Sequence, residues 1–101
     1  MVAFLLYSTN RGQNVIFEWD PEKEKTNENK HKVIFSDACF VFADNYMLTF
    51  FDEEHSEKED RWVTIGQVKG NKILVVVHTY RKTGGKESVR IISARKATKR
   101  E

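Results

Sequence analysis

The sequence is poor in cysteine and glycine, and each scarcity narrows what the chain can be. Cys39 is the only cysteine among 101 residues, so no disulfide can form within the chain and no zinc site can be built from several thiolates. The few glycines form no nucleotide-binding loop, because Gly84-Gly85 is typical of a turn. A chain of this length is expected to form a single domain with one modest core.

Long apolar runs are also missing. The apolar stretch at residues 2–7 is shorter than the core of a signal peptide, and no lysine or arginine precedes it. No segment approaches the roughly 20 apolar residues that a membrane-spanning helix needs. We therefore expect a cytoplasmic protein without membrane association.

The net charge of +2 conceals an uneven distribution. Residues 72–101 carry nine lysines or arginines against two glutamates, a net charge of +7 that leaves −5 on the rest of the chain. A basic half of this kind suits a polyanion such as nucleic acid. A solvated basic tail explains the pattern equally well, and charge alone does not decide between the two interpretations.

The order of apolar and polar segments predicts an α+β fold with two helices on one face of a four- to five-stranded, mainly antiparallel sheet. The expected strands alternate in polarity or are wholly apolar, and they cover residues 15–19, 46–51, 61–69, 72–80 and 89–94. Capping residues and apolar spacing place the expected helices at residues 21–31, 35–43 and 94–101, the last one short and basic. Residues 1–14 are expected to be an N-terminal extension with an edge strand and a turn, and residues 15–101 one domain.

The helix expected at residues 21–31 contains no aliphatic or aromatic residue. Lys23, Asn27 and His31 recur every four residues and therefore line one helix face, where an ordinary helix would carry apolar residues. This polar stripe indicates a binding site. A solvent-exposed helix held by charge pairs is the competing interpretation, and both remain open at this point.

Several residues that could take part in catalysis or metal binding are explained more simply by packing or by exposure to solvent. Cys39 shares a face with apolar residues of its helix and is expected in the core rather than as a nucleophile. His78 shares a strand face with Leu74 and Val76, which favours a core-edge histidine over a catalytic one. His55 stands among acidic residues without a partner at metal-ligand spacing, so no metal site is expected.

The remaining histidines and arginines permit RNA cleavage without a metal, although any basic α+β domain could present the same residues. Such cleavage needs a base for the ribose 2′-hydroxyl, an acid for the leaving oxygen, and cations that stabilise the charge developing on the phosphate. Histidine suits the proton transfers, and arginine grips two phosphate oxygens at once.

Three ordered motifs carry a family resemblance. The first is Phe17-Glu18-Trp19-Asp20-Pro21-x-Lys23 with Asn27, Lys30-His31 and Val33-x-Phe35; the second is His55-Ser56 with Glu59, Arg61 and Ile65-Gly66; the third is Arg90-Ile91-Ile92-Ser93-Ala94-Arg95-x-Ala97 with Glu101. In this order and spacing, from about residue 15 to 101, they resemble the BrnT-type toxins of bacterial type II toxin–antitoxin systems.

The resemblance implies a RelE-like fold and a cofactor-free endoribonuclease that cleaves RNA by 2′-hydroxyl attack and arrests growth. It implies a ribbon-helix-helix antitoxin of the BrnA type as partner, with DNA bound only through the toxin–antitoxin complex. It also supplies a candidate site with five catalytic residues, His31, His55, Arg61, Arg90 and Arg95. Five further residues are expected to bind the substrate: Lys23, Asn27, Lys30, Glu59 and Ser93.

Two other functions compete with this interpretation. A catalytically inactive module of the same fold would bind RNA or a protein without cleaving it, and the scattered histidines are compatible with that. A DNA-binding repressor is disfavoured, because the only basic helix expected is short and terminal and no helix-turn-helix precedes it.

Overall fold

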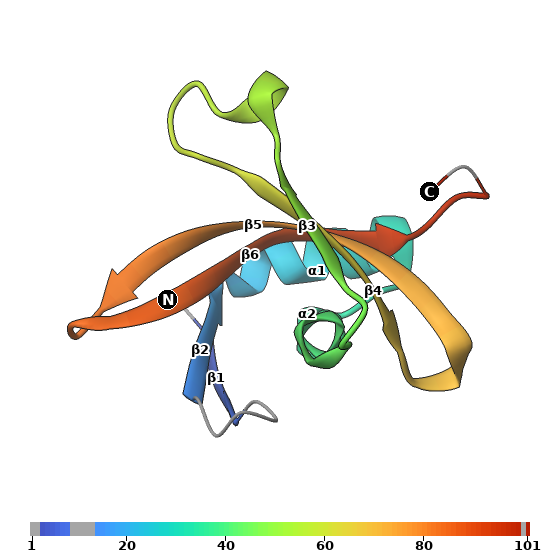
Figure 1. The fold of residues 1–101 in the computed structure, drawn as a ribbon, viewed down its shortest axis with the longest axis horizontal. Helices are drawn as coiled ribbons and strands as arrows, with labels where there is room; N and C mark the ends of the chain where they lie inside the picture. Colours follow the sequence, from blue (N-terminus) through green and yellow to red (C-terminus); the bar gives the residue numbers. More distant parts are fainter. Residues whose placement is uncertain (1–2, 9–13, 100) are drawn as a thin grey trace.

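The computed structural model describes residues 3–8, 14–99 and 101, and it places six strands in one mixed sheet of order β1-β2-β6-β5-β4-β3 (Figure 1). The strands are β1 (Ala3–Ser8), β2 (Asn14–Trp19), β3 (Leu48–Phe51), β4 (Trp62–Val68), β5 (Lys72–Thr83) and β6 (Lys86–Lys96). Neighbouring strands run antiparallel except for β2 and β6, which are parallel. The expected α+β class is confirmed, with six strands rather than four or five because β1 adds an edge strand.

Two helices cover one face of the sheet (Figure 1). Helix α1 (Pro21–His31) begins where the Asp20 carboxylate accepts a hydrogen bond from the Glu22 N–H at 2.9 Å, and it ends at Lys32, whose φ is 60°. Helix α2 (Phe35–Ala38) continues as the 3-10 helix η1 (Cys39–Ala43). The helix expected over residues 35–43 is thus two short pieces, and no described helix is long and apolar enough to cross a membrane.

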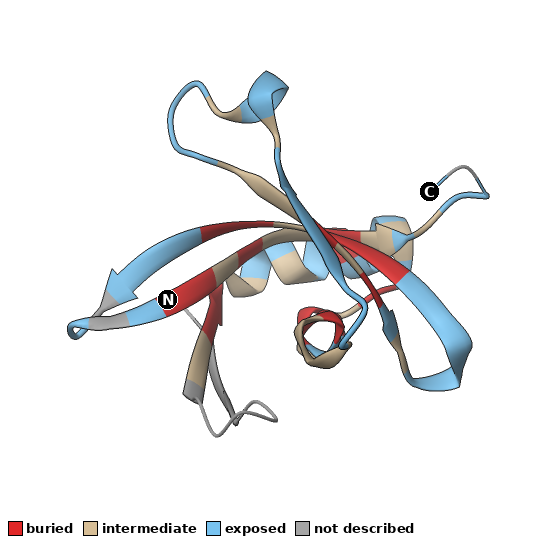
Figure 2. Ribbon diagram, viewed as in Figure 1, coloured by how far each residue is buried: buried red, intermediate tan, exposed pale blue. Residues whose placement is uncertain are grey.

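The core lies between these helices and the sheet (Figure 2). Phe17, Phe35, Val41 and Val76 are completely buried. Gly66 on β4 lets η1 approach closely, because a Cβ at this position would lie 2.9 Å from the Val41 carbonyl oxygen. The sheet face opposite the helices, which we call the open face, carries no helix in the described part of the chain (Figure 1).

The C-terminal helix expected at residues 94–101 is wrong. Strand β6 extends to Lys96, and the Ala97 N–H then donates to the Ile73 carbonyl at 2.8 Å, which continues the pairing with β5. Ala94 is completely buried against the core. Burial and ladder pairing therefore outweigh the helix preference of this segment.

The long β5–β6 hairpin contains one irregularity. Val77 pairs with Ser93 and His78 with Ile91, so Ile92 is an extra residue and forms a β-bulge. Strands β4 and β5 are joined by the three residues 69–71, because Val68 pairs with Lys72, and Gly70 and Asn71 both adopt positive φ there. The turn expected at residues 8–14 falls mainly on residues 9–13, which lie outside the described residues.

Candidate functional site

The sequence-predicted residues gather mainly in two hollows that share no residue. The α1 hollow, of about 510 Å³, includes Lys23, Asn27, Lys30, His31 and Ser93 in its lining. The His55 hollow, of about 550 Å³, is lined by Glu54, His55, Glu57, Lys58, Glu59, Arg61 and Arg81. Arg90 and Arg95 line neither hollow.

Hydrogen bonds join the two ends of the loop that forms the His55 hollow. The Asp52 N–H donates to the Arg61 carbonyl at 2.9 Å. Ser56 completes the closure, because its hydroxyl donates to the Asp52 carbonyl and accepts from the Arg61 N–H. The segment between Asp52 and Arg61, which includes the 3-10 helix η2 (Glu53–His55), is therefore anchored at both ends to β3 and β4.

His55 is oriented by a carboxylate. Its Nδ1 lies 2.9 Å from Asp52 Oδ2, while the imidazole remains 63% exposed. Because a carboxylate only accepts hydrogen bonds, Nδ1 carries the proton and Nε2 of the neutral ring is left as an acceptor toward solvent. This arrangement presents one defined imidazole nitrogen for proton transfer.

Two arginines and a glutamate share the hollow with His55. Arg81 Nη2 lies 3.2 Å from Glu59 Oε2, and both side chains are about two-fifths exposed. Among the described residues no hydrogen bond or ion pair engages the Arg61 guanidinium, which lines the same hollow. The hollow therefore combines a histidine, two guanidinium groups and the ammonium of Lys58 with three carboxylates, those of Glu54, Glu57 and Glu59.

Arg81 was not expected from the sequence. The predicted strand ended at residue 80, which placed Arg81 in a turn, whereas β5 continues to Thr83. The signal was present in the alternation of the strand, because Thr79 and Arg81 are two residues apart and therefore share a face.

The ladder register places Arg61 and Arg90 on one level of the open face. His78 faces the core, where its ring lies 5.0 Å from that of Phe42, so the next residue, Thr79, faces the opposite way. Thr79 pairs with Arg90, and Arg61 immediately precedes Trp62, the partner of His78. Arg61 and Arg90 are therefore separated by two strand spacings, about 10 Å.

Arg90 has an acidic neighbour on the same level. Its Nη1 lies 3.9 Å from Oε1 of Glu18, the residue that pairs with it across β2 and β6. Glu18 is buried, and Arg90 is partly exposed on the open face. Arg61, which immediately precedes β4, forms a polar row with Thr79 of β5, Arg90 of β6 and Glu18 of β2.

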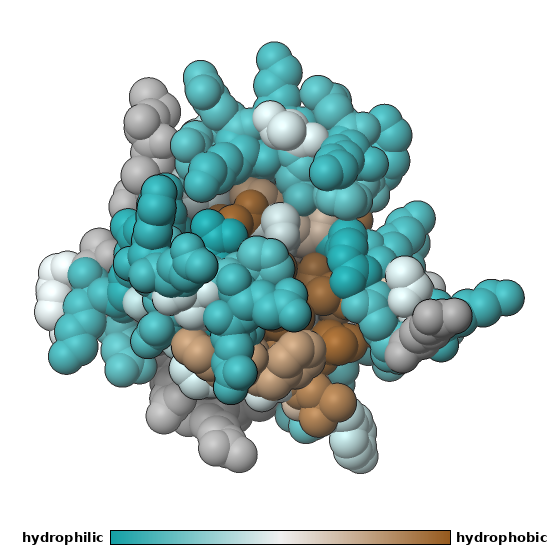
Figure 3. All heavy atoms as spheres, turned by 90° about the horizontal axis from the view of Figure 1, so that it is seen from above, coloured by the Kyte–Doolittle hydropathy of each residue, from teal (hydrophilic) through white to brown (hydrophobic). Residues whose placement is uncertain are grey.

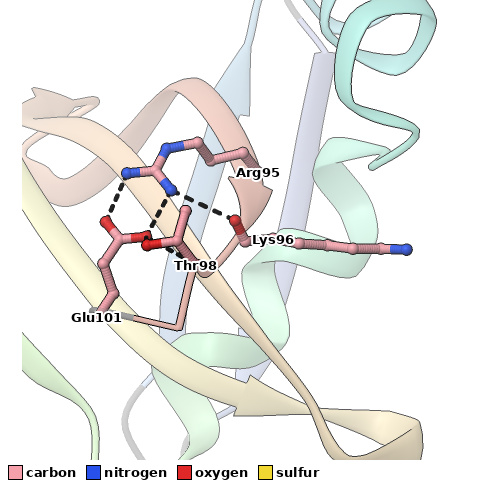
Figure 4. Close-up of polar contacts among 4 residues, drawn as sticks. All are labelled: Arg95, Lys96, Thr98 and Glu101. Atoms are coloured by element: carbon pink, nitrogen blue, oxygen red, sulfur yellow. Dashed lines mark hydrogen bonds and ion pairs between the residues drawn. The ribbon is translucent and has the colours of Figure 1, made fainter.

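Arg95 lies five residues beyond Arg90, and its guanidinium is engaged by a carboxylate (Figure 4). The two terminal nitrogens donate to Glu101 at 2.7 and 2.6 Å, a bidentate pair that Thr98 reinforces through its N–H. The hydrogen bonds from Arg95 lower the pKa of Glu101 to about 2. The structure thus brings Arg61, Arg81 and Arg90 together on one end of the open face and leaves Arg95 outside this group.

Asn27 is fully engaged by the backbone. Its amide nitrogen donates to the carbonyls of Val33 and Ala94, at 2.9 and 2.8 Å, and its amide oxygen accepts from the Ala94 N–H at 3.0 Å. The side chain therefore pairs with β6 as a neighbouring strand would, beyond the point where β2 ends. Asn27 is buried and fixes α1 against the sheet, and it also lines the α1 hollow, so its expected substrate-binding role stays a prediction.

Lys23, Lys30 and His31 remain at the α1 hollow, beside Ser93 of the bulged segment. The polar stripe seen in the sequence therefore has two functions in the fold, since Asn27 attaches the helix and its neighbours line a hollow. Among the described residues no group of three or more His, Cys, Asp or Glu side chains is arranged to hold a metal ion.

Comparison with known proteins identifies the family of this chain. The family model described as "Ribonuclease toxin, BrnT, of type II toxin-antitoxin system" matches residues 19–101. The chain belongs to the BrnT family of ribonuclease toxins. It is similar to the crystal structure of the Brucella abortus ribonuclease toxin BrnT, with 29% identity and a TM-score of 0.56, over 80% of this chain and 94% of that one. A search of curated protein sequences finds no match.

As a BrnT family member the chain is a ribonuclease toxin of a type II toxin–antitoxin system, and an antitoxin partner follows from that membership. The resemblance stated from the motifs is therefore confirmed. All three motifs meet in the polar row, because the first motif supplies Glu18, the second supplies Arg61 and the third supplies Arg90.

Proposed function

We propose that the chain is a metal-independent endoribonuclease whose catalytic centre is the His55 hollow together with the polar row of the open face. The observation that carries the proposal is the Asp52–His55 pair beside Arg61 and Arg81. The oriented imidazole transfers protons to and from the reacting oxygens, with Glu59 as the second proton-transferring group. The reaction is attack of the ribose 2′-hydroxyl on the adjacent phosphorus, with the 5′ oxygen as leaving group.

Arg61, Arg81 and Arg90 stabilise the charge that develops on the phosphate oxygens in the transition state. Thr79 supports this assignment, because its hydroxyl lies between Arg61 and Arg90 in the row, is buried, and has no hydrogen-bond partner among the described residues. Lys23, Lys30, His31 and Ser93 then hold a neighbouring part of the RNA strand at the α1 hollow.

The remaining features of the proposal follow the family. The fold is RelE-like, residues 15–101 are the toxin domain, and the partner is a ribbon-helix-helix antitoxin of the BrnA type that carries the DNA contacts. The protein acts in the cytoplasm, where its RNA substrate is found. The antitoxin requirement rests on family membership, whereas the site assignment rests on the geometry of the described residues.

Incubation of the purified protein with a short RNA in the presence of EDTA tests the function. We expect cleavage that leaves a 2′,3′-cyclic phosphate and that a 2′-deoxy substitution at the cleaved position prevents. His55→Ala should lower the rate by about 10²–10⁴-fold, the usual contribution of a general acid or base. Lys25→Ala, an exposed change on α1 outside both hollows, is the control.

Two results would contradict the proposal. Full activity of His55→Ala and of Arg61→Ala would exclude the His55 hollow as the catalytic centre. RNA binding that weakens with salt, while the RNA stays intact in the absence and presence of divalent cations, would favour the binding module instead.

A further inference from the structure

The open face also has an apolar region beside the polar row. Two rows next to the polar row are apolar across β3, β4 and β5. One row aligns Leu48, Ile65 and Val75, and the other aligns Phe50, Val63 and Val77. We call these six residues the apolar rows. The second row lies two residues farther along the strands than the polar row, at a distance of about 7 Å.

The apolar rows reach the solvent at β3. Leu48 is 66% exposed and Phe50 50%, and Tyr46 and Met47 just before β3 are exposed as well. Phe51, which pairs with Trp62 and contacts its ring, points to the opposite face. Residues 46–51 contain no charge and no proline, although edge strands usually carry such residues as protection against pairing. In the view from above, apolar surface appears in several patches between hydrophilic atoms, mainly in the middle and lower part of the molecule (Figure 3). Neighbouring exposed apolar side chains such as Leu48 and Phe50 mark an interaction surface.

Strand β3 is an edge of the sheet whose outer backbone groups can accept another strand. The hydrogen bond from the Asp52 N–H to the Arg61 carbonyl shows which residue pairs of the β3–β4 ladder are hydrogen-bonded. Because bonded and non-bonded pairs alternate in an antiparallel ladder, Leu48 and Phe50 bond toward β4, and the backbone groups of Thr49 and Phe51 point away from it. The edge therefore offers regularly spaced donors and acceptors to an extended segment.

The charges around this surface indicate the kind of occupant. No lysine or arginine lies in residues 46–51 or in the apolar rows. Arg95, which pairs with Val75 at the β6 end of the first row, is engaged by Glu101, so phosphate groups of RNA would find no unpaired cation at these residues. The adjoining loop at residues 52–60 has six acidic residues and one lysine. An occupant with apolar and basic side chains fits both features.

A second copy of this chain fits less well. Antiparallel pairing through β3 would place the end of one strand beside the start of the other. The acidic loop of each copy would then lie near Asp44 of its neighbour, where like charges repel.

We propose that the antitoxin docks on the apolar rows and adds an extended segment, rich in apolar and basic residues, to the free edge of β3. The inference rests on the proposed function, because the protein partner is the antitoxin and the blocked site is the His55 hollow. Asp52, which orients His55, directly follows β3, so a segment that runs along β3 past Phe51 covers the entrance of that hollow. Neutralisation then results from covering the catalytic centre without any change in its geometry.

The test uses the protein encoded by the reading frame adjacent to the toxin gene, purified separately and titrated against the toxin. Phe50→Ser removes an exposed ring from the surface. Thr49→Pro removes an outward N–H without disturbing the ladder to β4, and Thr49→Val is its control because it loses only the hydroxyl bonded to Thr64 at 2.8 Å. Phe40→Ser, at a phenylalanine on η1 that is 40% exposed, is the matched control outside the surface.

Phe50→Ser and Thr49→Pro should each weaken antitoxin binding by about tenfold or more, as expected for a residue at the centre of an interface. Thr49→Val and Phe40→Ser should bind like the unchanged protein. RNA cleavage by the free toxin variants should stay unchanged, so a failure of this inference differs from a failure of the ribonuclease assignment. Circular dichroism confirms that each variant folds, and Leu48→Ser replaces any that does not.

Three outcomes would overturn the inference. The first is unchanged antitoxin binding by Phe50→Ser and Thr49→Pro. The second is a toxin dimer in light scattering that Phe50→Ser dissociates, which would assign the surface to a second copy. The third is weaker RNA binding by Phe50→Ser with unchanged antitoxin binding, which would assign the surface to the substrate.

Discussion

Arg61 and Arg90 come from distant parts of the sequence, and the sheet register sets them on one level of the open face with Thr79 between them. Arg61 immediately precedes β4 at the end of the loop that carries His55 and Glu59, whereas Arg90 lies within β6. Their separation therefore depends on the pairing of β4, β5 and β6 together with the hydrogen bonds that close this loop at Asp52 and Ser56.

The Asp52–His55 pair predicts that Asp52→Asn lowers activity while the protein remains folded. An amide in place of the carboxylate weakens the interaction that fixes the imidazole, and it can also select the wrong ring nitrogen as donor. We expect RNA cleavage to fall by about tenfold or more, within the range of general acid–base effects. Single-turnover cleavage across pH measures this, with Glu53→Gln in the same loop as control.

Arg81→Ala should separate catalysis from stability. Its pair with Glu59 is largely exposed, and such pairs contribute little to folding, about 0–1 kcal/mol. The rate of RNA cleavage should fall by about 10²–10³-fold if Arg81 stabilises the transition state. Cleavage rate and thermal unfolding are measured on the same sample, with Lys82→Ala as neighbour control; a variant that loses stability but keeps its rate would refute the assigned role.

Asn27→Ala should destabilise the fold strongly. The substitution removes three buried hydrogen bonds and leaves groups of Val33 and Ala94 without partners, which should cost about 2–4 kcal/mol of the free energy of unfolding. Urea titration provides the measurement. Asn29→Ala, an exposed change on the same helix, should be nearly neutral, and equal stability of the two variants would show that the helix attachment has been misidentified.

His78 predicts a loss of stability at acidic pH. Burial lowers the pKa of His78 from 6.5 to about 4, so between these values the unfolded chain binds a proton that the folded protein excludes. This group leaves the free energy of unfolding constant above pH 6.5 and decreases it below, by about 3 kcal/mol near pH 4.

Urea titrations from pH 8 to pH 4 on the unchanged protein and on His78→Gln measure that loss. The lowered pKa values of Asp44 and Glu101 affect both proteins equally near pH 4, so the difference between the two curves isolates the contribution of His78. Parallel pH curves for the two proteins would show that His78 is not the cause.

Cys39 should be unreactive until the protein unfolds. Burial raises the pKa of its thiol to about 12, and Sγ donates to the Phe35 carbonyl at 3.2 Å. Because the thiolate is the reactive form, the native protein should not react with a disulfide reagent at pH 8, whereas the denatured chain should react with one equivalent. Rapid reaction of the native protein would show that the η1 segment opens readily.

Local chemistry in the sequence predicted much of the fold. Capping residues predicted the start of α1, where Asp20 accepts from the Glu22 N–H and Pro21 takes the first helical position, because these residues act through their own local geometry. The C-terminal helix failed because the partner of residues 94–97 is β5, a contact that no local pattern reports.

The candidate site was predictable in composition and less so in arrangement. His55, Glu59 and Arg61 lie close together in the sequence and line one hollow in the structure. Asn27 shows the limit of the sequence, because a buried amide that pairs with a distant strand has the same sequence signature as an amide in a binding site. The division of the open face into polar and apolar rows needs the register of four strands, and the bulge at Ile92 interrupts the alternation that would have indicated it.

The β-bulge at Ile92 also determines which residue of the β5–β6 hairpin can be deleted without moving its neighbours to the other face of the sheet. Shortening β6 by the single residue Ile92 would restore an unbroken ladder while Ile91 still pairs with His78 and Ser93 with Val77, so each side chain would keep its face. Deletion of Val76 from β5 would instead move the side chains of half of that strand to the opposite face of the sheet. Sequence alignments of relatives should therefore tolerate a gap at Ile92 and resist one at Val76.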